Sequence, residues 1–157
     1  MNGNDPRRAR PDGIDPAARS RARRRALQAI YAWQLSGQSI AQVITQFRTE
    51  QDMEIADLAY FEDLLRGVDG NLAKIDEELR RFVDRDIAQI DPIERGVLRL
   101  AAYELLFRID VPYRVVLNEA IETTKRFGAD HGHSYVNGVL DRAAAQWRDA
   151  EVSSARG

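Results

Sequence analysis

The sequence contains no cysteine and only two histidines, His131 and His133. The lack of cysteine excludes a disulfide framework, a thiol nucleophile and a cysteine-ligated zinc or iron–sulfur site. The two histidines are not part of an HExxH or comparable pattern, so we predict no metal site and no cofactor. A chain without cysteine suits a reducing compartment, and we expect a cytoplasmic protein.

Long apolar runs and catalytic motifs are also missing. No run approaches the roughly 18 to 20 residues of a membrane span, and the start MNGNDPRRARPDG lacks the apolar segment of a secretory signal. There is no glycine-rich phosphate loop, no GxSxG motif and no dinucleotide fingerprint. Neighbouring carboxylates such as Glu119 and Glu122 could support acid–base chemistry, but on helices such groups are far more often solvated or ion-paired. We therefore expect neither membrane insertion nor enzymatic activity.

Charge is distributed unevenly along the chain. The formal net charge of all 157 residues is −2, yet residues 1–25 hold eight arginines against three aspartates. A basic end on an acidic body suggests an anionic partner for one part of the surface.

Hydrophobic spacing predicts helices and no convincing strand, hence an all-α single-domain bundle of about seven helices. Residues 1–14 are expected to be a disordered basic tail, residues 15–150 the helical domain and residues 151–157 a disordered C-terminal tail. The predicted helices run from Pro16 to about Gly37, from after Ser39 to about Phe47, over 56–68, over 71–83, from Pro92 to about Arg108, from about Val111 to Gly128 and over 134–149. Asp15 and Asp91, each followed by proline, are predicted N-caps.

The stretch RSRARRRALQAIYAWQ concentrates arginines at the start of the first helix. With Ile30 at the centre of the buried side, helical spacing places Arg21, Arg24 and Gln28 on the opposite side together with Arg25, and Tyr31 at the border. Arg23 falls on the apolar side, so we expect the bundle to stop before it and the first two turns to project. Cations are unfavourable at a helix N-terminus, whereas phosphate is attracted there, so this face is either a candidate for binding phosphate groups or only a solvated charged face.

The stretch FGADHGHSYVNGVLD is the second unusual one, because a polar loop leads Tyr135 and Asn137 into the start of the last helix. An aromatic ring at such a place can stack on an unpaired base. The alternative is a loop with a capping serine, Ser134, and a tyrosine half-buried against a neighbour.

Five stretches in this order resemble the NusB family of bacterial antitermination factors. They are RRRALQAIYAWQLS, YFEDLLRGV, DPIERGVLRLAAYEL, VPYRVVLNEAIETTKRFG and YVNGVLD, and the resemblance covers about residues 18–147. It implies an all-helical fold of two packed subdomains without enzymatic activity. It also implies binding of boxA RNA in ribosomal RNA leader transcripts together with NusE, a small-subunit ribosomal protein, in a complex that joins the elongating RNA polymerase with other Nus factors. A weak homodimer is a further expectation from the resemblance.

The resemblance also suggests site residues. Its RNA surface maps onto Arg19, Arg21, Arg23, Arg24, Ser134, Tyr135 and Asn137, to which the helix face above adds Gln28 and Tyr31. Its NusE contact maps onto Glu94, Arg95, Arg99 and Glu104, part of which forms a charged ridge on the predicted helix from Pro92. The chain departs from the family at His131 and Gly132, where an acidic residue next to a serine is common, and at Ser20, which interrupts the arginine run.

Two other functions stay open at this point. NusB-like domains also occur fused to RNA methyltransferases, but we expect no methyl-donor domain to fit within these 157 residues, and the length of the native reading frame would decide this. In the other alternative the chain is a structural helical adaptor whose arginines only keep the surface solvated.

Overall fold

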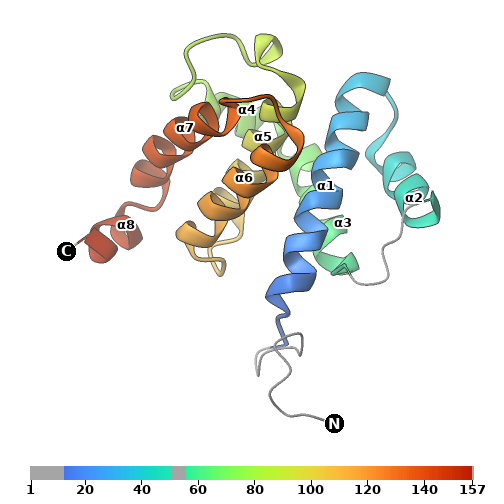
Figure 1. The fold of residues 1–157 in the computed structure, drawn as a ribbon, viewed down its shortest axis with the longest axis horizontal. Coiled ribbons are helices and arrows are strands. Elements are labelled where there is room, and N and C mark those ends of the chain that lie inside the picture. Colours follow the sequence, from blue (N-terminus) through green and yellow to red (C-terminus); the bar gives the residue numbers. More distant parts are fainter. Residues whose placement is uncertain (1–12, 51–55, 157) are drawn as a thin grey trace.

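The computed structural model describes residues 13–50 and 56–156, which form eight α-helices, one short 3₁₀ helix and no strand. The elements are α1 (Pro16–Ser36), α2 (Ile40–Glu50), α3 (Leu58–Gly70), α4 (Leu72–Leu79), η1 (Ile87–Gln89), α5 (Pro92–Phe107), α6 (Tyr113–Phe127), α7 (Gly132–Trp147) and α8 (Asp149–Arg156) (Figure 1). The all-helical prediction is confirmed. The predicted tail falls almost wholly on residues 1–12, which lie outside the described residues.

Local sequence signals set the helix ends. The Asp15 carboxylate accepts hydrogen bonds from the backbone N–H groups of Ala17 and Ala18, at 3.0 and 3.3 Å, as predicted for an N-cap. Asp91 does the same at the start of α5. Helix α1 ends at Gly37, whose φ of 73° lies in the left-handed region that favours glycine.

Helix α5 is the centre of the bundle. It packs against α1, α3, α4, α6 and α7, and its buried face runs from Gly96 to Leu105. Helices α2 and α3 lie against α1 on one side, while α6 and α7 lie on the other side of the same long helix (Figure 1). One continuous apolar core includes side chains from all eight α-helices, so the chain is a single domain. Within the described part of the chain, every helix is too short or too polar to cross a bilayer.

The C-terminus differs from its prediction as a disordered tail, because residues 149–156 form α8. Arg148, only 7 % exposed, donates to the carbonyl oxygens of Leu105 and Arg108 at 2.7 and 3.0 Å, near the end of α5. The last carbonyls of a helix lack partners within it and need other donors. The Arg108 carbonyl, just beyond the helix, also accepts from the backbone N–H of Val111 at 3.0 Å. Glu151 accepts from Arg148 at 2.6 Å and from the backbone N–H of Tyr113 at 2.9 Å. Together with buried Val152, these contacts hold α8 on the corner between α5 and α6.

Gly67 of α3 lies close to α5, because an added Cβ would lie 2.2 Å from the ring of Tyr103. We predict that Gly67→Ala lowers the free energy of unfolding by about 1–3 kcal/mol, because the ring and its hydrogen bond to Asp63 must shift. Chemical denaturation followed by circular dichroism measures this. The matched control is Gly70→Ala at the end of the same helix, where an added Cβ meets nothing within 4 Å. Equal stability of the two variants would contradict the close approach.

Candidate nucleic-acid interface

The first part of the candidate interface is a basic hollow between α1 and the end of α6. It has a volume of about 320 Å³ and is lined by Arg21, Arg24, Arg25, Gln28, Ala56, Arg126 and Phe127. Helical spacing predicted that the α1 residues of this set share one side, and the structure places them together. They do not project freely, because all four are partly buried against neighbouring segments. We call this cavity the arginine hollow.

A second hollow of about 380 Å³ continues along α6. Its lining includes Ser20, Glu119, Glu122, Thr123 and Lys125, and it shares Arg24 and Arg126 with the arginine hollow. The Ser20 hydroxyl donates to Glu119 Oε1 at 2.6 Å, which ties the start of α1 to α6. The serine that interrupts the arginine run therefore contributes to helix packing.

Positive charges crowd together at this place. Burial lowers the pKa of the Arg24 guanidinium, and Arg126, Arg21 and Arg25 lower it further by repulsion, while Glu119 opposes the shift. A cluster of like charges favours occupancy by an anion, which relieves the repulsion.

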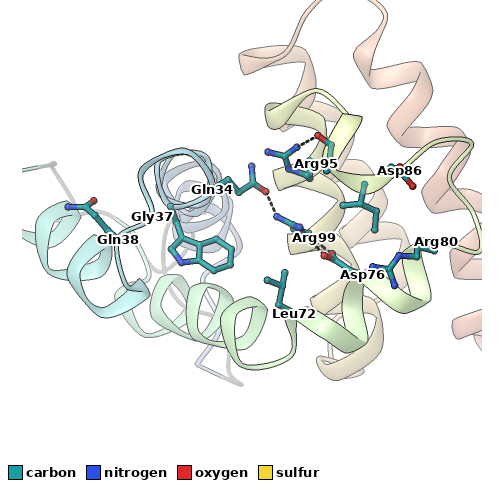
Figure 2. A pocket seen from close by; sticks show the side chains of 12 residues that line it. Gln34, Gly37, Gln38, Leu72, Asp76, Arg80, Asp86, Arg95 and Arg99 are labelled. Carbon is teal, nitrogen blue, oxygen red and sulfur yellow. Dashed lines mark hydrogen bonds and ion pairs between the residues drawn. The ribbon is translucent and has the colours of Figure 1, made fainter.

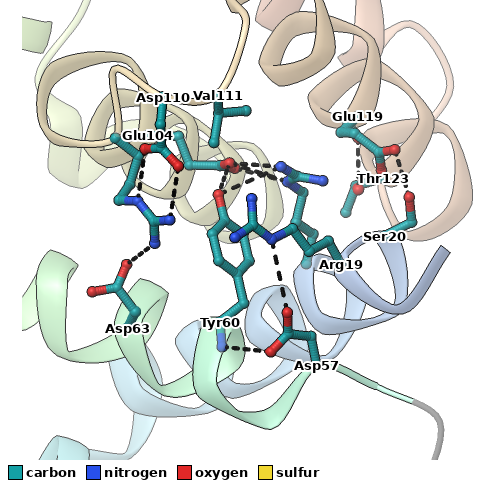
Figure 3. Close-up of polar contacts among 12 residues, drawn as sticks. Arg19, Ser20, Asp57, Tyr60, Asp63, Glu104, Asp110, Val111, Glu119 and Thr123 are labelled. Atoms are coloured by element: carbon teal, nitrogen blue, oxygen red, sulfur yellow. Dashed lines mark hydrogen bonds and ion pairs between the residues drawn. The ribbon is translucent and has the colours of Figure 1, made fainter. Parts of the chain in front are cut away.

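The position of Arg23 contradicts the prediction that the bundle stops before this residue and that the first two turns of α1 project from it. Its side chain is 7 % exposed, and its guanidinium donates two hydrogen bonds to Glu104 of α5, from Nε at 2.9 Å and from Nη2 at 2.8 Å. The Tyr60 hydroxyl of α3 donates to the same carboxylate, and Figure 3 shows its ring pointing toward Glu104. The carboxylate raises the pKa of the Arg23 guanidinium against the opposing effect of burial. Helix α1 is thus packed from its second turn onward, and Arg23 forms a buried ion pair with α5.

Arg19 is also engaged with the body of the protein. Its guanidinium lies 4.2 Å from the ring centroid of Tyr60, and its Nε lies 3.7 Å from the Asp57 carboxylate (Figure 3). The side chain is 16 % exposed. Of the four arginines that the resemblance assigned to RNA, only Arg21 and Arg24 line the arginine hollow.

The start of α7 forms the second part of the candidate interface. Ser134 and Asn137 are exposed, while Tyr135 is partly buried. The Tyr135 hydroxyl donates to Asp84 at 3.3 Å, and the Arg85 guanidinium lies 4.8 Å from the ring centroid. Ser134 lies inside the helix, which begins at Gly132 after His131 in the left-handed conformation with φ of 73°. Only residues 128–131 separate Phe127 in the arginine hollow from α7, so the two parts are neighbours along the chain.

The four residues suggested for a protein partner do not lie on one surface. Arg95 and Arg99 line a different hollow of about 680 Å³ between α1, α4, η1 and α5 (Figure 2). Arg99 forms a two-pronged ion pair with Asp76 at 2.9 and 3.0 Å and also donates to Gln34 at 2.9 Å. Glu94 lies against Gly132, and Glu104 is 3 % exposed in the pair with Arg23. The prediction that Glu104 contacts a protein partner directly is therefore wrong, because its side chain is buried.

Sequence reasoning missed Arg126 and Lys125. Both occupy the last turn of α6, where cations complement the negative end of the helix dipole. In the sequence they look like ordinary helix-ending residues, so only the crossing of α6 near α1 reveals their position. Among the described residues, no group of three or more histidine, aspartate or glutamate side chains could hold a metal.

The buried pair generates a stability prediction. Glu104→Gln leaves the Arg23 guanidinium buried without its counter-charge, so we expect a loss of about 3–5 kcal/mol in the free energy of unfolding. Urea denaturation measures this, with Glu122→Gln as the control because that carboxylate is 73 % exposed. In the double variant Arg23→Met/Glu104→Gln the guanidinium is absent, and the combined loss is expected to be smaller than the sum of the single losses. Additive losses would contradict the pairing.

The fold and the basic hollows define an all-helical protein with a surface suited to a polyanion. A family model for the NusB family matches residues 20–145. The transcription antitermination protein NusB of Xanthomonas oryzae pv. oryzae is 66 % identical over 149 residues, which cover 95 % of this chain and 96 % of the relative. That of Xanthomonas axonopodis pv. citri is 65 % identical over 149 residues, covering 95 % of this chain and 94 % of the relative. The chain therefore belongs to the NusB family.

Solved structures agree with this assignment. NusB of T. maritima superposes with a TM-score of 0.72 at 31 % identity, covering 81 % of this chain and 90 % of that chain. A complex of the antitermination factors NusB and NusE with double-stranded RNA contains a chain with a TM-score of 0.71 at 22 % identity, covering 81 % of this chain and 96 % of that chain. This second likeness supports the fold.

Proposed function

We propose that the chain is a transcription antitermination factor that binds boxA RNA of ribosomal RNA leader transcripts together with NusE. The observation that carries the proposal is that the α1 arginines meet the end of α6 in one hollow. Only four residues separate that end of α6 from the start of α7. The antitermination relatives from Xanthomonas support it, and the solved neighbour that holds NusB with NusE and RNA is the precedent for both partners. The factor acts by binding, without catalysis, in the cytoplasm. It joins the elongating polymerase through other Nus factors.

The residues have different roles in this proposal. Arg21 and Arg24, with Gln28 beside them, hold phosphates, which gives affinity that depends on salt and hardly on sequence. Tyr135, Ser134 and Asn137 contact unpaired bases, and Tyr31, which is 38 % exposed on α1, offers a further ring. Arg19 contributes through its packing on Tyr60.

Glu94, Arg95 and Arg99 remain candidates for the NusE contact. Weak self-association would compete for the RNA surface.

The arginine contribution is tested by fluorescence anisotropy of a labelled boxA RNA and a scrambled control, with and without NusE, at several salt concentrations. Arg21→Ala/Arg24→Ala is expected to weaken both RNAs alike. It should also reduce the slope of log K against log salt by about 0.7 for each phosphate of a single strand that the variant no longer neutralises. The control is Arg66→Ala/Lys74→Ala, which removes two charges from side chains that are 56 and 59 % exposed on α3 and α4. Equal slopes for both variants would disprove phosphate binding by α1.

Base recognition is tested separately with Tyr135→Ala. We expect a loss of about 1–3 kcal/mol on boxA RNA and a smaller loss on the scrambled RNA, because stacking on an unpaired base is removed. Tyr135→Phe is the matched control, since it removes only the hydroxyl bound to Asp84 and keeps the ring. If both variants select boxA as well as the unchanged protein does, Tyr135 has no part in base recognition.

A further inference from the structure

Arg126 is the one side chain of α6 that lines both hollows together with Arg24 of α1, among the residues that the structure describes. Phe127 beside it lines only the arginine hollow, and Lys125 only the neighbouring one. Two helices far apart in the sequence therefore bring guanidinium groups to the boundary between two adjacent cavities.

The helix dipole does not account for this arrangement. A cation in the last turn of α6 is favourable wherever it points, and Lys125 meets that need while pairing with Glu122 at 3.8 Å. Arg126 instead lies where its charge repels Arg24. The acidic groups at the second hollow are Glu119, which accepts from Ser20 and also attracts Arg24, and Glu122, which pairs with Lys125.

We propose that Arg24 and Arg126 form a two-helix clamp for phosphodiester groups, with the two hollows holding successive phosphates of one RNA strand. Arg21 and Arg25 also line the arginine hollow, and Lys125 lines the other hollow. The inference rests on the proposed function and deepens it, because it adds the end of α6 to the RNA surface. It also defines the path of the strand, which passes from α1 over Arg126 toward the start of α7.

A clamp that contacts only phosphodiester groups should not distinguish between nucleic-acid sequences. Its contribution is the same for boxA RNA, for scrambled RNA and for single-stranded DNA of the boxA sequence, because all three carry the same phosphates. Arg126→Lys keeps the charge but loses the planar fork, so it retains the salt slope and part of the affinity.

The experiment compares Arg126→Gln with Arg66→Gln, which removes one exposed arginine of α3. We expect Arg126→Gln to bind all three single strands about three- to tenfold more weakly, with a salt slope smaller by about 0.7. Arg66→Gln is expected to match the unchanged protein. The double variant Arg24→Gln/Arg126→Gln is expected to lose less than the product of the single effects, because the two side chains share one ligand. Thermal unfolding of each variant by circular dichroism verifies that Arg126→Gln remains folded.

The outcomes separate the clamp from the proposed function. If the unchanged protein binds boxA RNA with NusE while Arg126→Gln keeps its affinity and salt slope, the clamp is wrong and the proposed function stands. If Arg126→Gln weakens only boxA RNA, the residue reads bases and the phosphodiester clamp is overturned. If the unchanged protein binds none of the single strands, with or without NusE, the proposed function and the clamp both fail.

Discussion

The buried contact between Arg23 and Glu104 is the constraint on which the candidate interface depends. It joins α1 to α5, and the Tyr60 hydroxyl adds α3 to the same carboxylate. An ion pair at this depth is costly to desolvate, so its net effect on stability is small when both partners are present. Its main consequence is geometric, because a charged group that must find its partner fixes the rotation of α1 about its own axis. That rotation directs Arg21, Arg24 and Arg25 toward the end of α6.

The arginines of α1 therefore fall into two groups that composition cannot separate. Arg19 and Arg23 pack on Tyr60 and satisfy acidic groups of the body, at Asp57 and Glu104. Arg21, Arg24 and Arg25 line a cavity in which positive charges accumulate. The first group holds the helix in place, and this placement brings the second group together around the cavity. A basic run that appears uniform in the sequence thus combines buried packing and the lining of a basic cavity along a few turns of one helix.

Much of the fold could be predicted from the sequence, because caps and helical spacing are local signals. Asp15, Gly37 and Asp91 set the helix ends where their residue types predicted. The same spacing placed Arg23 on the apolar side, but the projecting end inferred from it was wrong, since its partner lies 81 residues further along the chain. Helix α8 was missed for the same reason, because Arg148 satisfies carbonyls of α5 that no local pattern connects to it. The proposed role of Arg126 also depends on two helices that are distant in the sequence and meet at the hollows.

The cost of gathering like charges explains why the hollows lie beside polar contacts that hold α1 in place. Repulsion among Arg21, Arg24, Arg25 and Arg126 would spread these side chains apart if their helices could move. The Ser20–Glu119 hydrogen bond and the Arg23–Glu104 pair prevent this by tying α1 to α6 and to α5. A cluster held in this way loses little conformational freedom when an anion arrives, so more of the electrostatic attraction contributes to affinity. If the hollows bind RNA as proposed, loosening the buried pair is therefore expected to weaken that binding, although Arg23 and Glu104 line neither hollow.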